Sequence, residues 1–213
     1  GAHNRFLSLE MIWPDNALLR AYVLSPRLGQ ISADLLDVPA VRLYHDNVLA
    51  KQAGCGRTPW HFDDHHFPLD TNDVVTAWVP AQPIPLEMGP LTFAYPLDVH
   101  ELVNAVTFEK TGTGYDRGVS DVFSKNNVSV NETPFELGEV SFHHNLNFHT
   151  ASSNRTNRSR VALANTYYRD GARVVNAPTM VSGDWQKFMP NVKPGDVAAS
   201  PLNPICWPVK DKS

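Results

Sequence analysis

The stretch TPWHFDDHHF, residues 58 to 67, gathers three histidines and two aspartates within ten residues. In an extended strand successive side chains point to opposite faces, so His61 and Asp63 share one face while Trp60 and Phe62 share the other. One imidazole and one carboxylate then form a chelating pair. A second histidine from a separate strand would complete the facial arrangement of two histidines and one carboxylate that leaves positions open on iron(II).

The remaining ligand must come from a distant part of the chain, and the segment SFHHNLNFHT, residues 141 to 150, offers three histidines. A lone histidine on a strand is often only a satisfied polar side chain, and this alternative applies to each of them. The turn-rich sequence that follows, with an arginine beyond it, favours His149 over His143 and His144. Residues 64 to 66 are expected to line the mouth of the site or to meet water.

Arg160 begins a strand pattern whose inward positions are small or polar. Alternation places Ala162, Ala164 and Thr166 on the same face as the guanidinium, which leaves room beside it. A buried arginine needs an anion, because an unpaired charge away from water is very unfavourable and a carboxylate satisfies the guanidinium with two parallel hydrogen bonds. No acidic residue is an obvious partner in the sequence. A surface arginine at the start of a strand is the alternative.

Short strands are expected to position these groups. Seventeen prolines and twelve glycines are spread along 213 residues, which favours an all-β core over long helices. Besides the strand of His61, patterns rich in β-branched and aromatic residues predict strands at 40–51, 73–84, 89–96, 137–152 and 159–170. In the first of these, alternation predicts one face formed by Val41, Leu43, His45, Asn47 and Leu49.

The chain before the first of these strands, residues 1 to 39, contains helix-compatible pieces at 16–24 and 28–37 and is expected to be a mainly helical cover. A short helix is expected near 98–106. No internal repeat and no sharp shift in composition divide the chain. We therefore expect one domain over residues 1–213.

Two segments lack a regular pattern. Residues 108–133 are polar, contain glycine and show no periodicity, which predicts a lid or binding loop beside the β core of residues 40–170. Residues 171–213 are rich in proline and are expected to be an irregular C-terminal tail.

Charge and composition narrow the partners. The formal charge is −4 and the eighteen basic residues form no long run, so the sequence predicts no nucleic-acid partner. The apolar runs are too short to cross a bilayer, and no signal-peptide pattern is present, so no membrane partner is expected. Cys55 and Cys206 form no disulfide framework, although a single bridge stays open, and this usage is typical of a reducing, cytoplasmic compartment. The sequence does not decide between a monomer and a homodimer.

In order along the chain, WHFD, TAWVPAQPIPLEMGPLTF and LGEVSFHHNLNFHTASSNRTNRSRVAL resemble the phytanoyl-CoA dioxygenase family of iron(II)- and 2-oxoglutarate-dependent oxygenases. The resemblance extends from about residue 40 to about residue 170. It implies a double-stranded β-helix, that is, a cupin-like jelly-roll barrel with flanking helices. Carried over by position, it implies that His61, Asp63 and His149 bind the iron, that Arg160 pairs with the distal carboxylate of 2-oxoglutarate, and that Trp78 and Asn47 line the cosubstrate site.

The resemblance also implies an activity. With Fe(II), 2-oxoglutarate and O₂, the protein would hydroxylate an unactivated C–H bond of a small-molecule substrate and release succinate and CO₂. A metal-dependent β-barrel hydrolase or isomerase with the same ligands is one alternative, and a non-catalytic barrel that binds a small ligand is another. Arg160 discriminates between them, because a zinc hydrolase needs no clamp for a cosubstrate carboxylate. The substrate itself does not follow from the residues.

Overall fold

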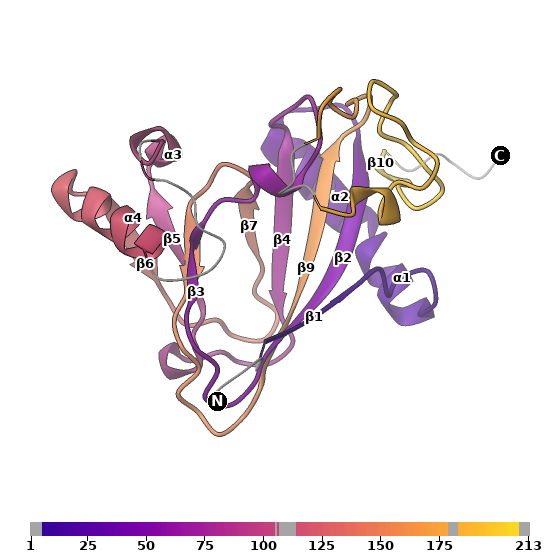
Figure 1. Cartoon of the computed structure of the whole chain (residues 1–213). Coiled ribbons are helices and arrows are strands. Elements are labelled where there is room, and N and C mark those ends of the chain that lie inside the picture. The colour runs from indigo at the N-terminus through magenta and orange to yellow at the C-terminus, as the bar shows by residue number, and fades with distance from the viewer. Residues whose placement is uncertain (1–5, 105, 107–113, 179–182, 209–213) are drawn as a thin grey trace.

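The core of the protein consists of two antiparallel β-sheets that face each other, with helices on their outer sides (Figure 1). The structure is a computed structural model, and it describes residues 6–104, 106, 114–178 and 183–208. The larger sheet has the order β1-β2-β9-β4-β7, with β10 pairing β2, and the smaller sheet has the order β3-β8-β5-β6. The predicted all-β, jelly-roll-like core is therefore confirmed, but the described strands form two facing sheets and not a closed barrel.

The centre of the larger sheet is formed by the long, mostly buried strands β2, β9 and β4, with shorter strands beside them. Its strands are β1 (Phe6–Glu10), β2 (Val41–Lys51), β4 (Val74–Pro80), β7 (Ser141–His144), β9 (Arg160–Arg169) and β10 (Ile205–Trp207). Strand β9 lies between β2 and β4 and pairs with both along most of its length. Its outer face packs against the helices α1 (Ala17–Val23) and α2 (Pro26–Leu36), in a core that includes Val23, Leu28, Val75 and Tyr167.

A β-bulge in β2 decides which of its side chains enter the interior. Leu43 pairs with Tyr167 whereas His45 pairs with Thr166, so β2 has one extra residue there, Tyr44. The prediction of a single face from Val41 to Leu49 is therefore wrong at this point. Val41 and Leu43 face the helices, while the next alternate residues share the inner face with the small side chains of β9, namely His45, Asn47, Leu49 and Lys51.

The smaller sheet is made of short strands and carries its own helical cover. Its strands are β3 (Thr58–His61), β5 (Leu91–Tyr95), β6 (Ser129–Glu132) and β8 (His149–Ala151). On its outer face a cluster formed by Trp60, Phe148 and neighbours joins the sheet to α3 (Val99–Leu102) and α4 (Gly114–Lys125). Figure 1 shows these two helices on the side of the molecule away from the larger sheet.

The segment predicted as a lid or binding loop, residues 108–133, is largely regular. It contains α4 and β6, and residues 108–113 lie outside the described part. The helix forms because Tyr115, Val119 and Phe123 recur every four residues and bury one stripe against Trp60 and its neighbours. Because polar residues separate these three side chains in the sequence, the apolar face of the helix was not recognised there.

The predicted strand over 137–152 is in fact two strands in different sheets. Strand β7 pairs with β4 in the larger sheet, and β8 pairs with β3 and β5 in the smaller one. Between them the chain turns at residues 145–148, where the Asn147 amide donates to the His144 carbonyl at 2.9 Å. Asparagine favours such turns, and this one carries the chain from one sheet to the other.

The two ends of the described chain also add regular structure. Strand β1 lies in the region predicted to be mainly helical and pairs with β2 from Phe6↔Lys51 to Glu10↔Asn47. The predicted irregular tail contributes β10, which pairs with β2, and the short 3₁₀ helix η4 (Trp185–Lys187). The side chains of Trp185, Phe188 and Met189 join a buried core with Tyr44.

Two further features bear on the composition of the chain. Cys55 and Cys206 are both buried and unpaired, so they form no bridge. Among the described residues, no helix combines the length and the apolar character needed to cross a membrane.

Candidate metal centre and cosubstrate site

Strand pairing brings the two predicted histidine ligands together. His61 of β3 and His149 of β8 are direct partners in the antiparallel ladder, and their ring centroids lie 4.1 Å apart. Asp63 follows β3, and its Oδ1 lies 3.8 Å from Nε2 of each ring. One ligand atom from each of the three residues falls within 4.8 Å of the others, so the set is spaced to hold a single metal ion.

Backbone carbonyls orient both rings in the same way. Nδ1 of His61 donates to the carbonyl of Pro59 at 2.9 Å, and Nδ1 of His149 donates to the carbonyl of Asn147 at 3.0 Å. Each carbonyl belongs to the residue two positions before its histidine. Because the proton is held on Nδ1, the lone pair of Nε2 is left for a metal, which is the usual way in which proteins fix a histidine ligand.

The turn between the sheets holds Asp63 in place. The Asn145 carbonyl accepts from the Asp63 amide at 2.8 Å and from the Asp64 amide at 3.1 Å. The Asn145 side chain in turn donates to Oδ1 of Asp64 at 2.9 Å. Asp64 therefore ties the end of β3 to the turn. The two histidines after it belong to the 3₁₀ helix η1 (Asp64–His66), where the His65 ring packs 4.2 Å from that of Phe62.

The protonation states of the site suit metal binding. Burial alone would raise the pKa of Asp63, but the neighbouring His149, His143 and His61 rings outweigh it and hold that pKa below its usual range. Burial lowers the pKa of His149 to about 3. At neutral pH the site thus contains an ionised carboxylate and a neutral imidazole, the forms that coordinate a metal.

Two more histidines, one buried and one half-buried, lie on the inner face of the larger sheet. His143, on the inner face of β7, is 5% exposed and places Nε2 3.5 Å from Oδ2 of Asp63, the oxygen that does not face the other two rings. His45, brought inside by the bulge, has its pKa lowered to about 4 by burial. Its pairing partner Thr166 also pairs with Thr76, and their hydroxyls are 3.0 Å apart.

Deeper in the interior lie two buried cations. Arg160 is 2% exposed, donates from Nη1 to the Gly89 carbonyl at 2.8 Å and lies 5.4 Å from the centre of the Trp78 ring. Lys51 pairs directly with Arg160 across the strands, is fully buried, and donates to the carbonyls of Ala151 and Ser152 at 3.1 and 2.7 Å. In the described part of the chain, no acidic side chain forms an ion pair with either cation.

The surroundings of these cations fit a dicarboxylate. Burial lowers the pKa of Arg160 to about 10. Burial and the nearby Arg160 charge together lower the pKa of Lys51 to about 8. Neither positive charge is therefore balanced by a nearby negative one. Nε of Arg160 and Nε1 of Trp78 are buried without a hydrogen-bond partner. Ala162 and Ala164 follow Arg160 on the same face of β9 and pack in the cluster around Trp78. An anionic ligand bound here would accept hydrogen bonds from these unpaired donors and lie against the small side chains.

Gly89 is required where it stands. Its φ is +75°, and a Cβ placed on it would lie 2.1 Å from the carbonyl oxygen of Ser152. No other residue fits that approach without movement of the backbone. Since the Gly89 carbonyl accepts from Arg160 and the Ser152 carbonyl accepts from Lys51, the close contact brings together the two carbonyls that anchor the cations.

The position of Asn47 supports a role in the cosubstrate site less strongly than the positions of the other predicted residues support theirs. It pairs with Ala164, which pairs in turn with Trp78, so the three residues form one row across the inner face of the larger sheet. Its Oδ1, however, accepts a hydrogen bond from the Ser8 hydroxyl of β1 at 2.9 Å. The side chain is therefore at least partly engaged in holding the edge strand.

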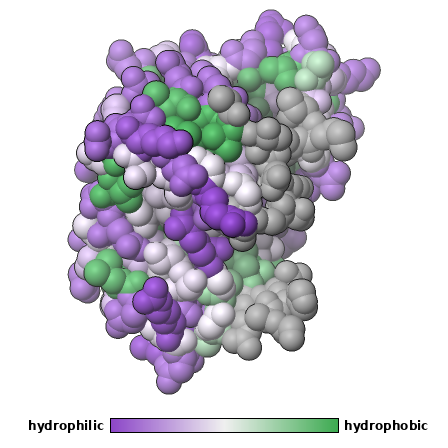
Figure 2. Space-filling model, turned by 60° about the vertical axis from the view of Figure 1, so that its left-hand side comes forward, coloured by the Kyte–Doolittle hydropathy of each residue, from purple (hydrophilic) through white to green (hydrophobic). Residues whose placement is uncertain are grey.

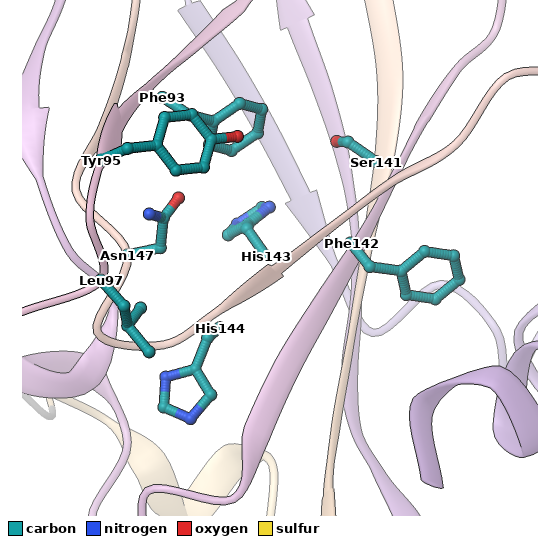
Figure 3. Close-up of a pocket in the computed structure, with 8 residues that line it drawn as sticks. All are labelled: Phe93, Tyr95, Leu97, Ser141, Phe142, His143, His144 and Asn147. Atoms are coloured by element: carbon teal, nitrogen blue, oxygen red, sulfur yellow. The ribbon is translucent and has the colours of Figure 1, made fainter. Parts of the chain in front are cut away.

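A cavity of about 360 Å³ opens between β5 and β7, beside the metal centre. In Figure 3 the rings of Phe93 and Tyr95 lie on the β5 side and the hydroxyl of Ser141 on the β7 side, with the ring of His143 between them. Phe93 pairs with His149 in the strand ladder, and the two ring centroids are 6.2 Å apart. The cavity thus extends to the residues that surround the predicted metal.

Comparison with known proteins agrees with this geometry. The sequence model of the phytanoyl-CoA dioxygenase (PhyH) family matches residues 7–162. The chain belongs to the phytanoyl-CoA dioxygenase family. The resemblance predicted from the HFD and distal histidine motifs is therefore confirmed, and the match extends over most of the chain. A comparison with curated proteins gives no match.

Solved structures share the PhyH-family fold. The α-ketoglutarate-dependent carbocyclase SnoK of nogalamycin biosynthesis superposes with a TM-score of 0.75 at 23% identity, over 94% of this chain and 76% of that one. The epimerase SnoN, solved with Fe³⁺, α-ketoglutarate and nogalamycin RO, gives 0.75 at 20% identity, over 95% and 78%. EctD from S. alaskensis, solved with 2-oxoglutarate and 5-hydroxyectoine, gives 0.66 at 15% identity, over 92% and 68%.

Sequence reasoning missed one member of this PhyH-family site and undervalued another. Lys51 was not singled out, although the alternation that leads from His45 through Asn47 reaches it in two further steps. His143 was considered only as a rival of His149 for the same ligand position. Nothing in the letters shows that β7 would direct it at the opposite oxygen of Asp63.

Proposed function

We propose that this PhyH-family protein is an Fe(II)- and 2-oxoglutarate-dependent oxygenase that oxidises an unactivated C–H bond of a small molecule, with hydroxylation as the outcome. One observation carries the proposal. A set of two histidines and one carboxylate and a pair of buried cations without an acidic partner face the same interior. A metal alone would need the first group only, whereas a metal with a chelating dicarboxylate needs both.

His61, Asp63 and His149 are proposed to hold the iron. Their protonation and ring orientation suit a divalent ion, and three protein ligands on one face leave three positions for other ligands. The backbone hydrogen bonds to Pro59 and Asn147 keep the two rings from turning away. Residues of these types and number fit iron(II), and they also bind zinc, so the cation pair is needed to choose between the two.

Arg160 and Lys51 are proposed to bind the distal carboxylate of 2-oxoglutarate. The guanidinium offers a planar pair of donors, the ammonium adds a second charge, and burial strengthens both interactions with an anion. Trp78 would add its unpartnered Nε1–H, and Asn47 is proposed as a weaker polar contact in the same row. The resulting enclosure excludes water from the cosubstrate.

The division of labour follows from these positions. When bound, iron(II) with 2-oxoglutarate and O₂ supplies the oxidising power, and the cosubstrate leaves as succinate and CO₂. The protein fixes the cosubstrate at one end through Arg160 and Lys51. It holds the metal ligands at the other end through β3, β8 and the turn at residues 145–148. The small-molecule substrate is proposed to reach the metal through the cavity between β5 and β7.

The neighbouring structures support the proposed cofactors. SnoN was solved with Fe³⁺ and α-ketoglutarate, and EctD with 2-oxoglutarate. Proteins with this fold also have other outcomes, since SnoK is described as a carbocyclase and SnoN as an epimerase. Hydroxylation is therefore the part of the proposal that depends most on experiment.

The test measures cosubstrate consumption. The purified protein is incubated with Fe(II), ascorbate, O₂ and 2-oxoglutarate carrying labelled carbon at its first carboxylate, and released CO₂ and succinate are quantified with and without a panel of small molecules. Equal amounts of succinate and CO₂ are expected for the wild type, and far less for Arg160→Ala. The matched control is Arg158→Ala, an exposed arginine two residues earlier. Hydrolytic or isomerase activity with zinc, with no 2-oxoglutarate consumed, would contradict the proposal.

A further inference from the structure

We propose that the cavity between β5 and β7 receives the primary substrate, that this substrate is an uncharged ring compound bearing a hydroxyl group, and that His143 is the residue that positions it. The inference rests on the proposed function for the identity of the metal. It goes beyond it by naming the class of substrate and the residue that connects substrate and metal. Four properties of the cavity carry it, namely its place, its charge, its aromatic wall and the two nitrogens of His143.

The place of the cavity ties it to the chemistry. Phe93 packs against two histidines, 6.2 Å from the ring of His149 and 5.5 Å from that of His143. The same residue packs against the cluster around Trp78 and Ala164, where the cosubstrate is proposed to lie. A molecule in the cavity would therefore lie against the metal ligands and beside the cosubstrate. At the outer end Tyr95 and Leu97 are 45% and 42% exposed and form an apolar mouth.

The lining of the cavity offers no carboxylate, ammonium or guanidinium partner to a charged guest. The described residues that line it contain no aspartate, glutamate, lysine or arginine. A carboxylate, phosphate or ammonium group buried there would have no partner of opposite charge, which is very unfavourable. Figure 2 shows hydrophobic residues in separate patches among hydrophilic ones on the face that it displays. Two aromatic rings on one wall, Phe93 and Tyr95, favour a ring compound that can pack against them.

The two ring nitrogens of His143 have different partners, the Asp63 carboxylate for one and the proposed substrate for the other. Nε2 lies 3.5 Å from Oδ2 of Asp63, so in the neutral ring this nitrogen carries the proton and donates to the carboxylate. Nδ1 is then an acceptor, and it is buried without any partner. The Ser141 hydroxyl, two residues earlier on the same face of β7, is also buried without a partner. A hydroxyl group of the substrate would satisfy Nδ1 by donating to it and would accept from Ser141.

This arrangement makes His143 a positioning residue with two separable roles. Through Nε2 it holds the outer oxygen of Asp63, which leaves Oδ1 directed at His61 and His149. Through Nδ1 it fixes the substrate hydroxyl relative to that same carboxylate. The orientation of the metal ligand and the orientation of the substrate thus depend on one ring.

Two conservative variants separate the roles. In His143→Gln the longer amide still places a donor near the position of Nε2 but offers no acceptor at Nδ1. In His143→Asn the shorter amide has an acceptor near Nδ1 but does not reach Asp63. The probes are 2-naphthol, which is neutral and donates a hydrogen bond, 2-methoxynaphthalene, which cannot donate, and 2-naphthoate, which is anionic at pH 7. Binding of each is measured by equilibrium dialysis without O₂, on the free protein and on the protein with Fe(II) and 2-oxoglutarate.

The proposal predicts a defined pattern. Wild-type protein should bind 2-naphthol about 5-fold to 10-fold more tightly than 2-methoxynaphthalene, the value of one buried hydrogen bond, and at least about 10-fold more tightly than 2-naphthoate. His143→Gln should lose the preference for naphthol and keep Fe(II) affinity within about 3-fold. His143→Asn should keep the preference and lose about 10-fold in Fe(II) affinity, as is usual when a group behind a metal ligand is removed. A merely structural role would move both quantities together.

The opposite results would overturn the inference. These are equal binding of naphthol and naphthoate by the wild type, or an unchanged naphthol preference in His143→Gln. Cosubstrate binding is followed separately, by the charge-transfer absorption of Fe(II) with 2-oxoglutarate. If that absorption is absent while naphthol binding depends on His143, the proposed function fails and the cavity assignment stands. If the absorption is present and the naphthol preference is absent, the cavity assignment fails and the proposed function stands.

Discussion

The two ends of the proposed site are built in different ways. The cations lie on the longest strands of the molecule, β2 and β9, which pair over almost their whole length and are covered by helices. The metal ligands lie on strands of four and three residues, β3 and β8, and on the residues just beyond β3. At the cation end the sheet itself fixes the side chains. At the metal end the turn at residues 145–148 and three backbone hydrogen bonds do so.

The two ends differ in construction because they have different ligands to bind. Two buried charges that have no acidic partner among the described residues oppose folding, and a long, well-packed sheet can hold them until a dicarboxylate binds. The metal end must leave one side open to the substrate and to O₂, and His61 accordingly lies on the edge strand β3, just before Asp63, which is only partly covered. If the ends are independent in this way, a change at one should affect the affinity for its own ligand and leave the other unchanged.

The largest effect is expected at Asp63. Asp63→Ala removes the only carboxylate of the metal set and should weaken Fe(II) binding by more than about 100-fold, since even changes behind a ligand cost about 10-fold to 100-fold. The measurement is an anaerobic Fe(II) titration without cosubstrate. Asp64→Asn removes the neighbouring negative charge and keeps an oxygen for Asn145, so its Fe(II) affinity should stay near that of the wild type. Equal losses in the two variants would show that charge alone matters.

The next largest effect is expected at Arg160. Arg160→Ala should weaken 2-oxoglutarate binding by about 2 kcal/mol, or about 30-fold, the scale of lost hydrogen bonds to a charged group. Fe(II) affinity in the absence of cosubstrate should not change, because the guanidinium belongs to the other end of the site. A parallel loss of Fe(II) affinity would break the separation of the two ends. Calorimetric titration of the metal-loaded protein with 2-oxoglutarate provides the comparison.

A smaller effect, visible in the pH profile, is expected at Lys51. Its pKa is lowered to about 8, so the free protein loses this charge as the pH rises through that value. The affinity for 2-oxoglutarate should fall by about 10-fold between about pH 7 and about pH 9, and Lys51→Met should lack this step. In the free protein the unfolded chain holds more protons than the folded one between about pH 8 and the ordinary lysine range, so stability due to this group rises with pH there. A wild-type affinity that does not change over this range would rule out a role for Lys51.

The smallest effect is expected at Asn47. Asn47→Ala removes the hydrogen bond from Ser8 and one polar group in the row of Trp78. The cosubstrate dissociation constant should rise by about 3-fold, and the free energy of unfolding should fall by about 1 kcal/mol or less, as expected for one partly exposed hydrogen bond. Ser8→Ala is the control, because it removes the same hydrogen bond without touching the inner face. If both variants change only stability, Asn47 has a structural role alone.

Part of this site follows directly from the sequence. The spacing of His61 and Asp63 predicts a chelating pair, and their side chains do lie 3.8 Å apart. The predicted reason, strand alternation, is wrong for Asp63, because β3 ends at His61 and Asp63 has helical backbone angles. The turn-rich segment after His149 favours it over His143 and His144, but the roles predicted for His149 and Arg160 come from the family resemblance. Local rules, the period of a strand and the preferences of turns, leave a surface position open for Arg160.

The remainder depends on where strands change partner. The predicted alternation of faces through residues 40–51 is wrong at Tyr44, because β2 has one extra residue there opposite β9. Nothing in the sequence indicates this bulge. The run over 137–152 reads as one strand, yet Asn145 and Asn147 turn it from one sheet into the other. This turn is what brings the rings of His143 and His149 together, 4.6 Å apart, each facing a different oxygen of Asp63. The role of Lys51 likewise appears only when β2 is seen beside β9.

The most direct test of the account is a crystal structure of the protein soaked without O₂ in Fe(II) and 2-oxoglutarate. We expect one metal ion bound by Nε2 of His61, Nε2 of His149 and a carboxylate oxygen of Asp63, with the distal carboxylate of the cosubstrate in contact with Arg160 and Lys51. A metal bound elsewhere, or a dicarboxylate that leaves both buried cations without a partner, would contradict the account.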